Sequence, residues 1–72
     1  MMSFVVYEVD LVKGEGKDPH TFQTREAART HAVNVVEGWR EGDDRIIFEG
    51  NMVLVQTQSG LLDFGTLITE VA

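Results

Sequence analysis

The stretch "LVKGEGKDPH", residues 11–20, carries the residue types that most suggest chemistry. A glycine-rich turn between a strand and a helix is the arrangement with which nucleotide-binding proteins hold phosphates. A Walker-type loop would need glycine at Leu11 and a hydroxyl at Asp18, and a dinucleotide-binding loop would need glycine at Pro19. The stretch fails both patterns, so we expect a mobile connector and not a phosphate site.

Metal binding and nucleophilic catalysis have equally little support. The chain has no cysteine, and its two histidines, His20 and His31, are too far apart in sequence for a structural zinc motif. Neither Ser3 nor Ser59 lies in a protease-like or lipase-like pattern. We therefore expect no enzymatic activity, no metal and no cofactor. His31 is interpreted as a boundary residue of a helix, or alternatively as a pH-sensitive hydrogen-bonding group between helix and sheet.

The composition is acidic, with 12 Asp and Glu against 6 Lys and Arg and a net charge of −6. Direct nucleic-acid binding normally needs a basic patch, which this chain lacks. The acidity serves either solubility or attraction to a basic partner surface. The absence of cysteine, of a signal peptide and of a long apolar run predicts a cytoplasmic protein without membrane contact.

Periodicity predicts a strand followed by a helix. Residues 3–12 alternate with period two, and Val5, Tyr7, Val9 and Leu11 form the face expected to be packed. Residues 13–23 are interpreted as a loop. Thr24 is the expected N-cap of a helix that stops near Gly42. The apolar stripe of this helix is expected to hold Ala28, Ala32, Val35 and Trp39, flanked by His31 and Val36.

Two hairpins are expected after the helix. Gly50-Asn51 between apolar runs predicts a two-residue turn that pairs Phe48 with Val53 and Ile46 with Val55. Ser59-Gly60 predicts a second turn that places Leu62 beside Thr57 and Phe64 beside Val55. Gly65 is interpreted as a bulge or a bend, and residues 66–71 as a continuing strand or a crossover to another edge.

These elements predict one α+β domain over residues 1–72, in which the order of elements along the chain is β-α-β-β-β. An antiparallel sheet of three to four strands would carry one amphipathic helix on one face. The other face would expose apolar residues with a charged border, which is typical of a protein interface. The predicted partner-binding set is Glu8, Asp10, Glu41, Asp43, Asp44, Arg45, Ile47, Glu49, Met52 and Leu54.

The sequence leaves three possible occupants of this outer face open. A chain of this size buries only about 60% of its unfolded surface, which favours self-association, so a homodimer is one expectation. A foreign protein partner is the second. The third alternative is that the C-terminal segment "LITEVA" folds back over the face. Depending on the strand order, Phe4 and Val6 would belong to the same apolar face as Ile47, Met52 and Leu54.

The segments "TREAARTHAVNVVEGW" and "RIIFEGNMVLVQ" give the chain a likeness to a known class of small proteins. A helix rich in small residues followed by a tight hairpin resembles the layout of small phage-encoded anti-CRISPR proteins. The resemblance covers a little under half of the chain, and no functional residue is carried over from it. It implies a stoichiometric inhibitor that occludes a basic, nucleic-acid-binding surface of a partner. The alternative function is a homodimeric structural or accessory protein whose acidity serves solubility.

Overall fold

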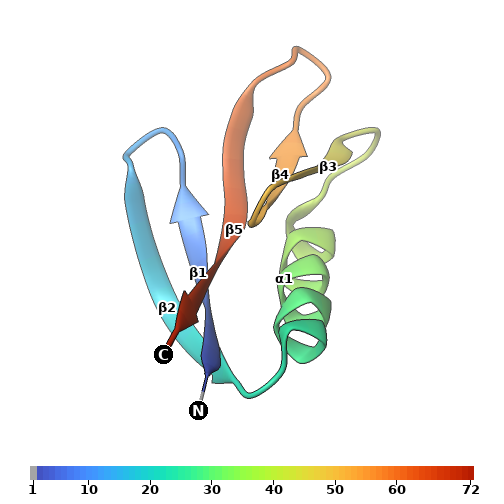
Figure 1. The fold of residues 1–72 in the computed structure, drawn as a ribbon. Helices are drawn as coiled ribbons and strands as arrows, with labels where there is room; N and C mark the ends of the chain where they lie inside the picture. The colour runs from blue at the N-terminus through green and yellow to red at the C-terminus, as the bar shows by residue number, and fades with distance from the viewer. Residues whose placement is uncertain (1) are drawn as a thin grey trace.

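The computed structural model describes residues 2–72, which form one sheet and one helix (Figure 1). The elements are β1 (Ser3–Asp10), β2 (Glu15–Phe22), α1 (Arg25–Trp39), β3 (Arg45–Glu49), β4 (Met52–Gln56) and β5 (Leu62–Val71). Every strand pair is antiparallel, and the order across the sheet is β2-β1-β5-β4-β3. The α+β class with one helix is confirmed, but the sheet has five strands and not three to four.

The additional strand is β2, which replaces much of the loop expected at residues 13–23. The hairpin turn after β1 is held by the Asp10 carboxylate, whose Oδ1 accepts from the backbone N–H groups of Val12 (3.0 Å) and Lys13 (3.1 Å). Strand β2 contains Pro19 and pairs with β1 through a register shift between Val6 and Glu8. Proline is tolerated because β2 is an edge strand with one free side. Pairing to β1 thus overrides the poor strand propensity of this segment.

The helix covers the face of β1 opposite to the one predicted. Phe4 and Val6 are buried in the core with the helix, whereas Val5, Tyr7 and Val9 lie on the outer face. The prediction followed the wholly apolar face from Val5 to Leu11 and was wrong, since the first half of the other face, with Phe4 and Val6, is apolar as well. The tertiary contacts decided the question, because the helix packs on β5, β1 and β4 from the Phe4 side.

The helix begins as predicted and buries a slightly different stripe. Thr24 is the N-cap, and its Oγ1 accepts from the N–H of Ala27 at 3.1 Å. The fully buried positions are Ala28, Ala32 and Val36, so Val36 takes the place expected for Val35. The helix ends at Trp39, three residues before Gly42, since the backbone at Arg40 is extended.

Across residues 2–72, no helix combines the length and the apolar character needed to cross a membrane.

The register of the first predicted hairpin is confirmed. Phe48 pairs with Val53 and Ile46 with Val55 across the turn, where Gly50 has a positive φ of 57°. Glycine at the first central position is the requirement of a type II′ turn.

The second hairpin is confirmed at one pair and shifted at the next. Phe64 pairs with Val55, but Leu62 pairs with Gln56 and not with Thr57, because the register shifts there. Strand β5 lies between β1 and β4 in the middle of the sheet. The alternative in which the C-terminal segment folds over the outer face is therefore wrong.

Candidate partner-binding cleft

The structure divides the predicted partner-binding residues among three places. Glu8 and Asp10 lie on the helix side of β1, opposite Thr66 and Phe64 of β5. The acidic residues after the helix lie in the loop that leads to β3; these are Glu41, Asp43 and Asp44. The remaining members lie on the outer face of β3 and β4; these are Arg45, Ile47, Glu49, Met52 and Leu54. Asp10, Glu41 and Asp44 nevertheless line one cleft, and Asp43 and Arg45 line a neighbouring depression.

The outer face is less exposed than the sequence suggested. Ile47 and Met52 are half-buried, and Leu54 retains only 5% of its exposed area although no other element covers this face. Leu54 lies opposite Gly65 of β5, where the missing side chain leaves room for it. The large apolar side chains that remain most open lie elsewhere, and include Trp39 and Phe48 at 52% each.

Trp39 lies at one end of the sheet, where the helix stops and the strands continue. A helix of 15 residues is about 22 Å long, whereas the ten residues of β5 extend about 33 Å. The helix therefore leaves the inner face of the sheet open near Asp10 and Phe64, which pair across β1 and β5. The hairpin ends of β1–β2 and β4–β5 form the walls of the resulting cleft.

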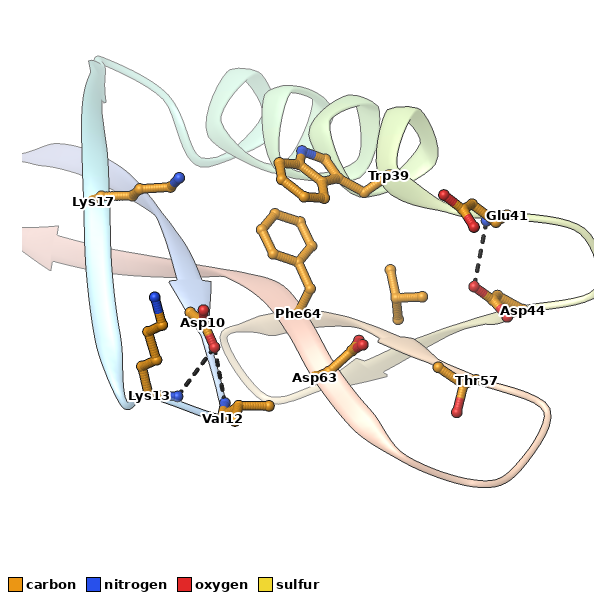
Figure 2. A pocket seen from close by; sticks show the side chains of 11 residues that line it. Asp10, Val12, Lys13, Lys17, Trp39, Glu41, Asp44, Thr57, Asp63 and Phe64 are labelled. Carbon is orange, nitrogen blue, oxygen red and sulfur yellow. Dashed lines mark hydrogen bonds between the residues drawn. The ribbon is translucent and has the colours of Figure 1, made fainter.

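This cleft has a volume of about 440 Å³ and an aromatic centre. The rings of Trp39 and Phe64 stack with centroids 4.2 Å apart and planes tilted by 21°. Figure 2 shows Glu41 and Asp44 on one side of this pair and Asp10, Lys13 and Lys17 on the other.

Acidic groups dominate the charge around the aromatic pair. Four carboxylates and two ammonium groups line the cleft, contributed by Asp10, Glu41, Asp44, Asp63, Lys13 and Lys17. The ion pairs within residues 2–72 are Arg25–Glu70 and Arg40–Glu37, so neither lysine neutralises a carboxylate by direct pairing. The cleft is therefore an acidic site with an aromatic floor.

Two of these carboxylates also hold the backbone around the cleft. Asp10 fixes the β1–β2 turn through Oδ1. Asp44 accepts from the backbone N–H of Glu41 at 3.3 Å, which closes the loop after the helix. Asp43 points to a neighbouring surface, where its Oδ2 accepts from Nε2 of Gln58 at 3.3 Å. The side chains of Glu41 and Asp63 have no such structural bond to the turns.

Sequence reasoning found three of the acidic residues of the cleft and missed its centre. Asp10, Glu41 and Asp44 were in the predicted set, whereas Asp63 and the Trp39–Phe64 pair were not. Trp39 was assigned to the buried stripe because its spacing fits the helix period. The predicted pairing of Phe64 with Val55 already placed Phe64 on the helix side of the sheet. This pairing was the one sequence feature that could have indicated a contact between Phe64 and the helix.

The two histidines lie together, which their sequence separation did not indicate. The ring centroids of His20 and His31 are 4.8 Å apart, and His31 also contacts Phe22 at 5.0 Å. His31 is half-buried between α1 and β2, in agreement with its interpretation as a boundary residue. Within residues 2–72, no three His, Asp or Glu side chains are grouped so that they could hold a metal ion.

Comparison with protein families, curated proteins and solved structures found no match for this chain.

Proposed function

We propose that this protein is a non-enzymatic protein-binding module whose acidic, aromatic cleft receives a basic segment of a partner. The observation that carries the proposal is Trp39. This residue is 52% exposed within a cleft lined by four carboxylates. The fully buried residues of the helix are Ala28, Ala32 and Val36, whereas Trp39, the largest side chain of the helix, leaves about half of its surface open.

The chemistry of the cleft favours a cationic side chain as the occupant. Arginine and lysine bind over an indole face with about 0.5–2 kcal/mol, depending on how far water is excluded. The Trp39 ring is held in place by its contact with Phe64, so little conformational entropy is lost on binding. Exposed tryptophans in pockets are also the side chains most enriched among residues that dominate binding energy.

The charges of the cleft add selectivity and steering. Glu41 and Asp63 face the cleft without ion-pair partners in residues 2–72, so a guanidinium that enters can bond with either carboxylate. The net charge of −6 draws a basic partner toward the protein and repels nucleic acid. The carboxylates therefore favour a basic peptide over nucleic acid as the bound partner.

The more specific form of the proposal is an inhibitor that occludes the nucleic-acid-binding surface of its partner. It is supported by the acidic cleft, and by the resemblance of the helix and hairpin layout to anti-CRISPR proteins. An inhibitor of this kind competes with phosphates by presenting carboxylates to the same arginines and lysines. The partner is then a basic protein or complex, and the chain itself binds no nucleic acid.

The single tryptophan makes the cleft directly observable. Titration with an oligoarginine peptide should change Trp39 fluorescence saturably, and the affinity should fall as salt is raised. Asp63→Asn and Glu41→Gln should each weaken binding about two- to fivefold. Trp39→Phe retains an aromatic ring and should also weaken binding, which is measured by isothermal titration calorimetry because this variant has no tryptophan.

Glu26→Gln is the matched control, since it removes one negative charge about 20 Å along the helix from Trp39. It should leave the affinity within about twofold. Equal effects of Glu26→Gln and Asp63→Asn would mean that only net charge attracts the peptide, and the cleft proposal would be wrong. The inhibitor form is tested separately, because the protein should then release a labelled oligonucleotide from the oligoarginine peptide.

A further inference from the structure

The two edges of the sheet differ in how well they are protected against pairing with another chain. The β2 edge contains Pro19, a register shift against β1, and Asp18 with a positive φ of 51°. Such features are the usual means by which proteins block strand addition. The β3 edge, Arg45–Glu49, has no proline or glycine and pairs with β4 without a register shift. One edge is blocked and the other is regular.

The backbone of β3 is oriented for pairing at its centre. Glu49 and Met52 flank the two-residue turn and pair with each other, as the closing residues of such a hairpin do. Because hydrogen-bonding direction alternates along a strand, the groups of Glu49, Ile47 and Arg45 point toward β4. Those of Ile46 and Phe48 point outward from the sheet, so an added strand would bond with these two residues.

The side chains of β3 match a second, antiparallel copy of themselves. When two β3 strands pair about Ile47, Arg45 of each copy lies opposite Glu49 of the other. On the same face, Ile47 meets Ile47 of the second copy between the two charge pairs. On the helix side, Ile46 meets Phe48 of the second copy twice. Within one chain Arg45 and Glu49 are about 13 Å apart along the strand and form no ion pair.

The helix side of β3 has apolar surface that this pairing would cover. The helix packs mainly on β5, β1 and β4, and leaves much of the helix side of β3 open. Phe48 is 52% exposed, and the guanidinium of Arg29 lies over the Phe48 ring, 4.9 Å from the ring centroid. Contact with Ile46 of a second copy would remove this exposed ring from water on both sides of a two-fold axis.

We propose that two copies of this chain associate through antiparallel pairing of their β3 strands about Ile47, forming one continuous ten-stranded sheet with both helices on the same face. The occupant of the edge is a second copy because its charges are self-complementary in this register. A shift of the register by two residues would place Arg45 or Glu49 opposite isoleucine. The interface is small, so the association is concentration-dependent. This association is independent of the cleft, because the cleft lies at the C-terminal end of α1 and no residue of β3 lines it.

Charge exchange tests both the edge and the register. Sedimentation velocity of the wild-type chain should show a mass that rises from one chain to two with concentration. Arg45→Glu and Glu49→Arg should each lower the association constant at least about fivefold, because like charges then face each other twice. An equimolar mixture of the two variants should associate again, since every charged pair is then opposite in sign. Arg45 and Glu49 are exposed and pair with the neutral Gln56 and Met52, so neither change disturbs the fold.

The matched control is Glu15→Arg at the β2 edge, which makes the same charge change as Glu49→Arg and should leave the association constant unchanged. A chain that stays monomeric at every concentration would overturn the proposal. So would a dimer that ignores both single variants, which would place the contact on the outer face. Single variants that lose association without recovery in the mixture would overturn the register.

Discussion

The side chain of Leu54 occupies the space that a side chain at Gly65 would need. These residues pair across β4 and β5, and a Cβ at position 65 would lie 2.6 Å from Cδ2 of Leu54 and 2.7 Å from the carbonyl oxygen of Val53. Leu54 is consequently only 5% exposed on a sheet face that has no covering element. Because Leu54 is buried in this way, the outer face offers less apolar surface to a partner than the sequence predicted. The cleft and the β3 edge are therefore the candidate interfaces.

Gly65→Ala should lower the free energy of unfolding by about 1–3 kcal/mol, because the backbone atom of Val53 cannot move without displacing β4. Urea denaturation measures this change. Gly38→Ala is the matched control, since no atom lies within 4 Å of the added Cβ and the position is an exposed helical one. It should stabilise the protein by about 0.5–1 kcal/mol. Equal effects of the two substitutions would contradict the close approach at Gly65.

Ala32→Leu should destabilise the protein by about 1–3 kcal/mol. Ala32 is fully buried between α1 and the sheet, and its carbonyl oxygen accepts from the Thr66 hydroxyl at 3.4 Å. A larger side chain would push the helix off β5. Ala27→Leu, on the exposed side of the same helix, should change stability by less than about 0.5 kcal/mol. Thermal unfolding of both variants separates overpacking from helix propensity.

Thr24→Ala should cost about 1 kcal/mol of stability, because the N–H of Ala27 would lose its side-chain acceptor. Thr30→Ala makes the same chemical change at an exposed position within the helix, and should be neutral or slightly stabilising. A comparable loss at both positions would show that the N-cap bond contributes no stability.

Asp10 allows its structural and binding roles to be separated. Asp10→Asn retains an oxygen that accepts from Val12 and Lys13, so stability should change by less than about 0.5 kcal/mol while oligoarginine binding weakens. Asp10→Ala removes both bonds and should cost about 1–2 kcal/mol. If Asp10→Asn left peptide binding unchanged, Asp10 would serve the turn alone.

The features that sequence reasoning predicted correctly depend on neighbours along the chain. The Gly50-Asn51 turn sets the register of β3 and β4, because a two-residue loop leaves only one pairing. Thr24 caps the helix through a residue three positions away. In both cases the partner lies within a few residues, so side-chain type and spacing contain the required information.

Tertiary structure decided the features that depend on which element packs beside which. β2 is a strand because β1 supplies its hydrogen bonds, although its own sequence includes Pro19 and Gly16, which disfavour strands. The packed face of β1 was predicted wrongly, because the unbroken apolar alternation from Val5 to Leu11 favoured the Val5 face, whereas the position of the helix selected Val6.

The candidate cleft has the same origin. It exists because the sheet extends past the end of the helix, which brings Trp39 onto Phe64 and gathers carboxylates from three separate segments. The sequence by itself therefore determined the turns, the helix start and the acidity of this protein. The folded chain decided where the acidity is concentrated, since contacts between distant segments bring those carboxylates to one place.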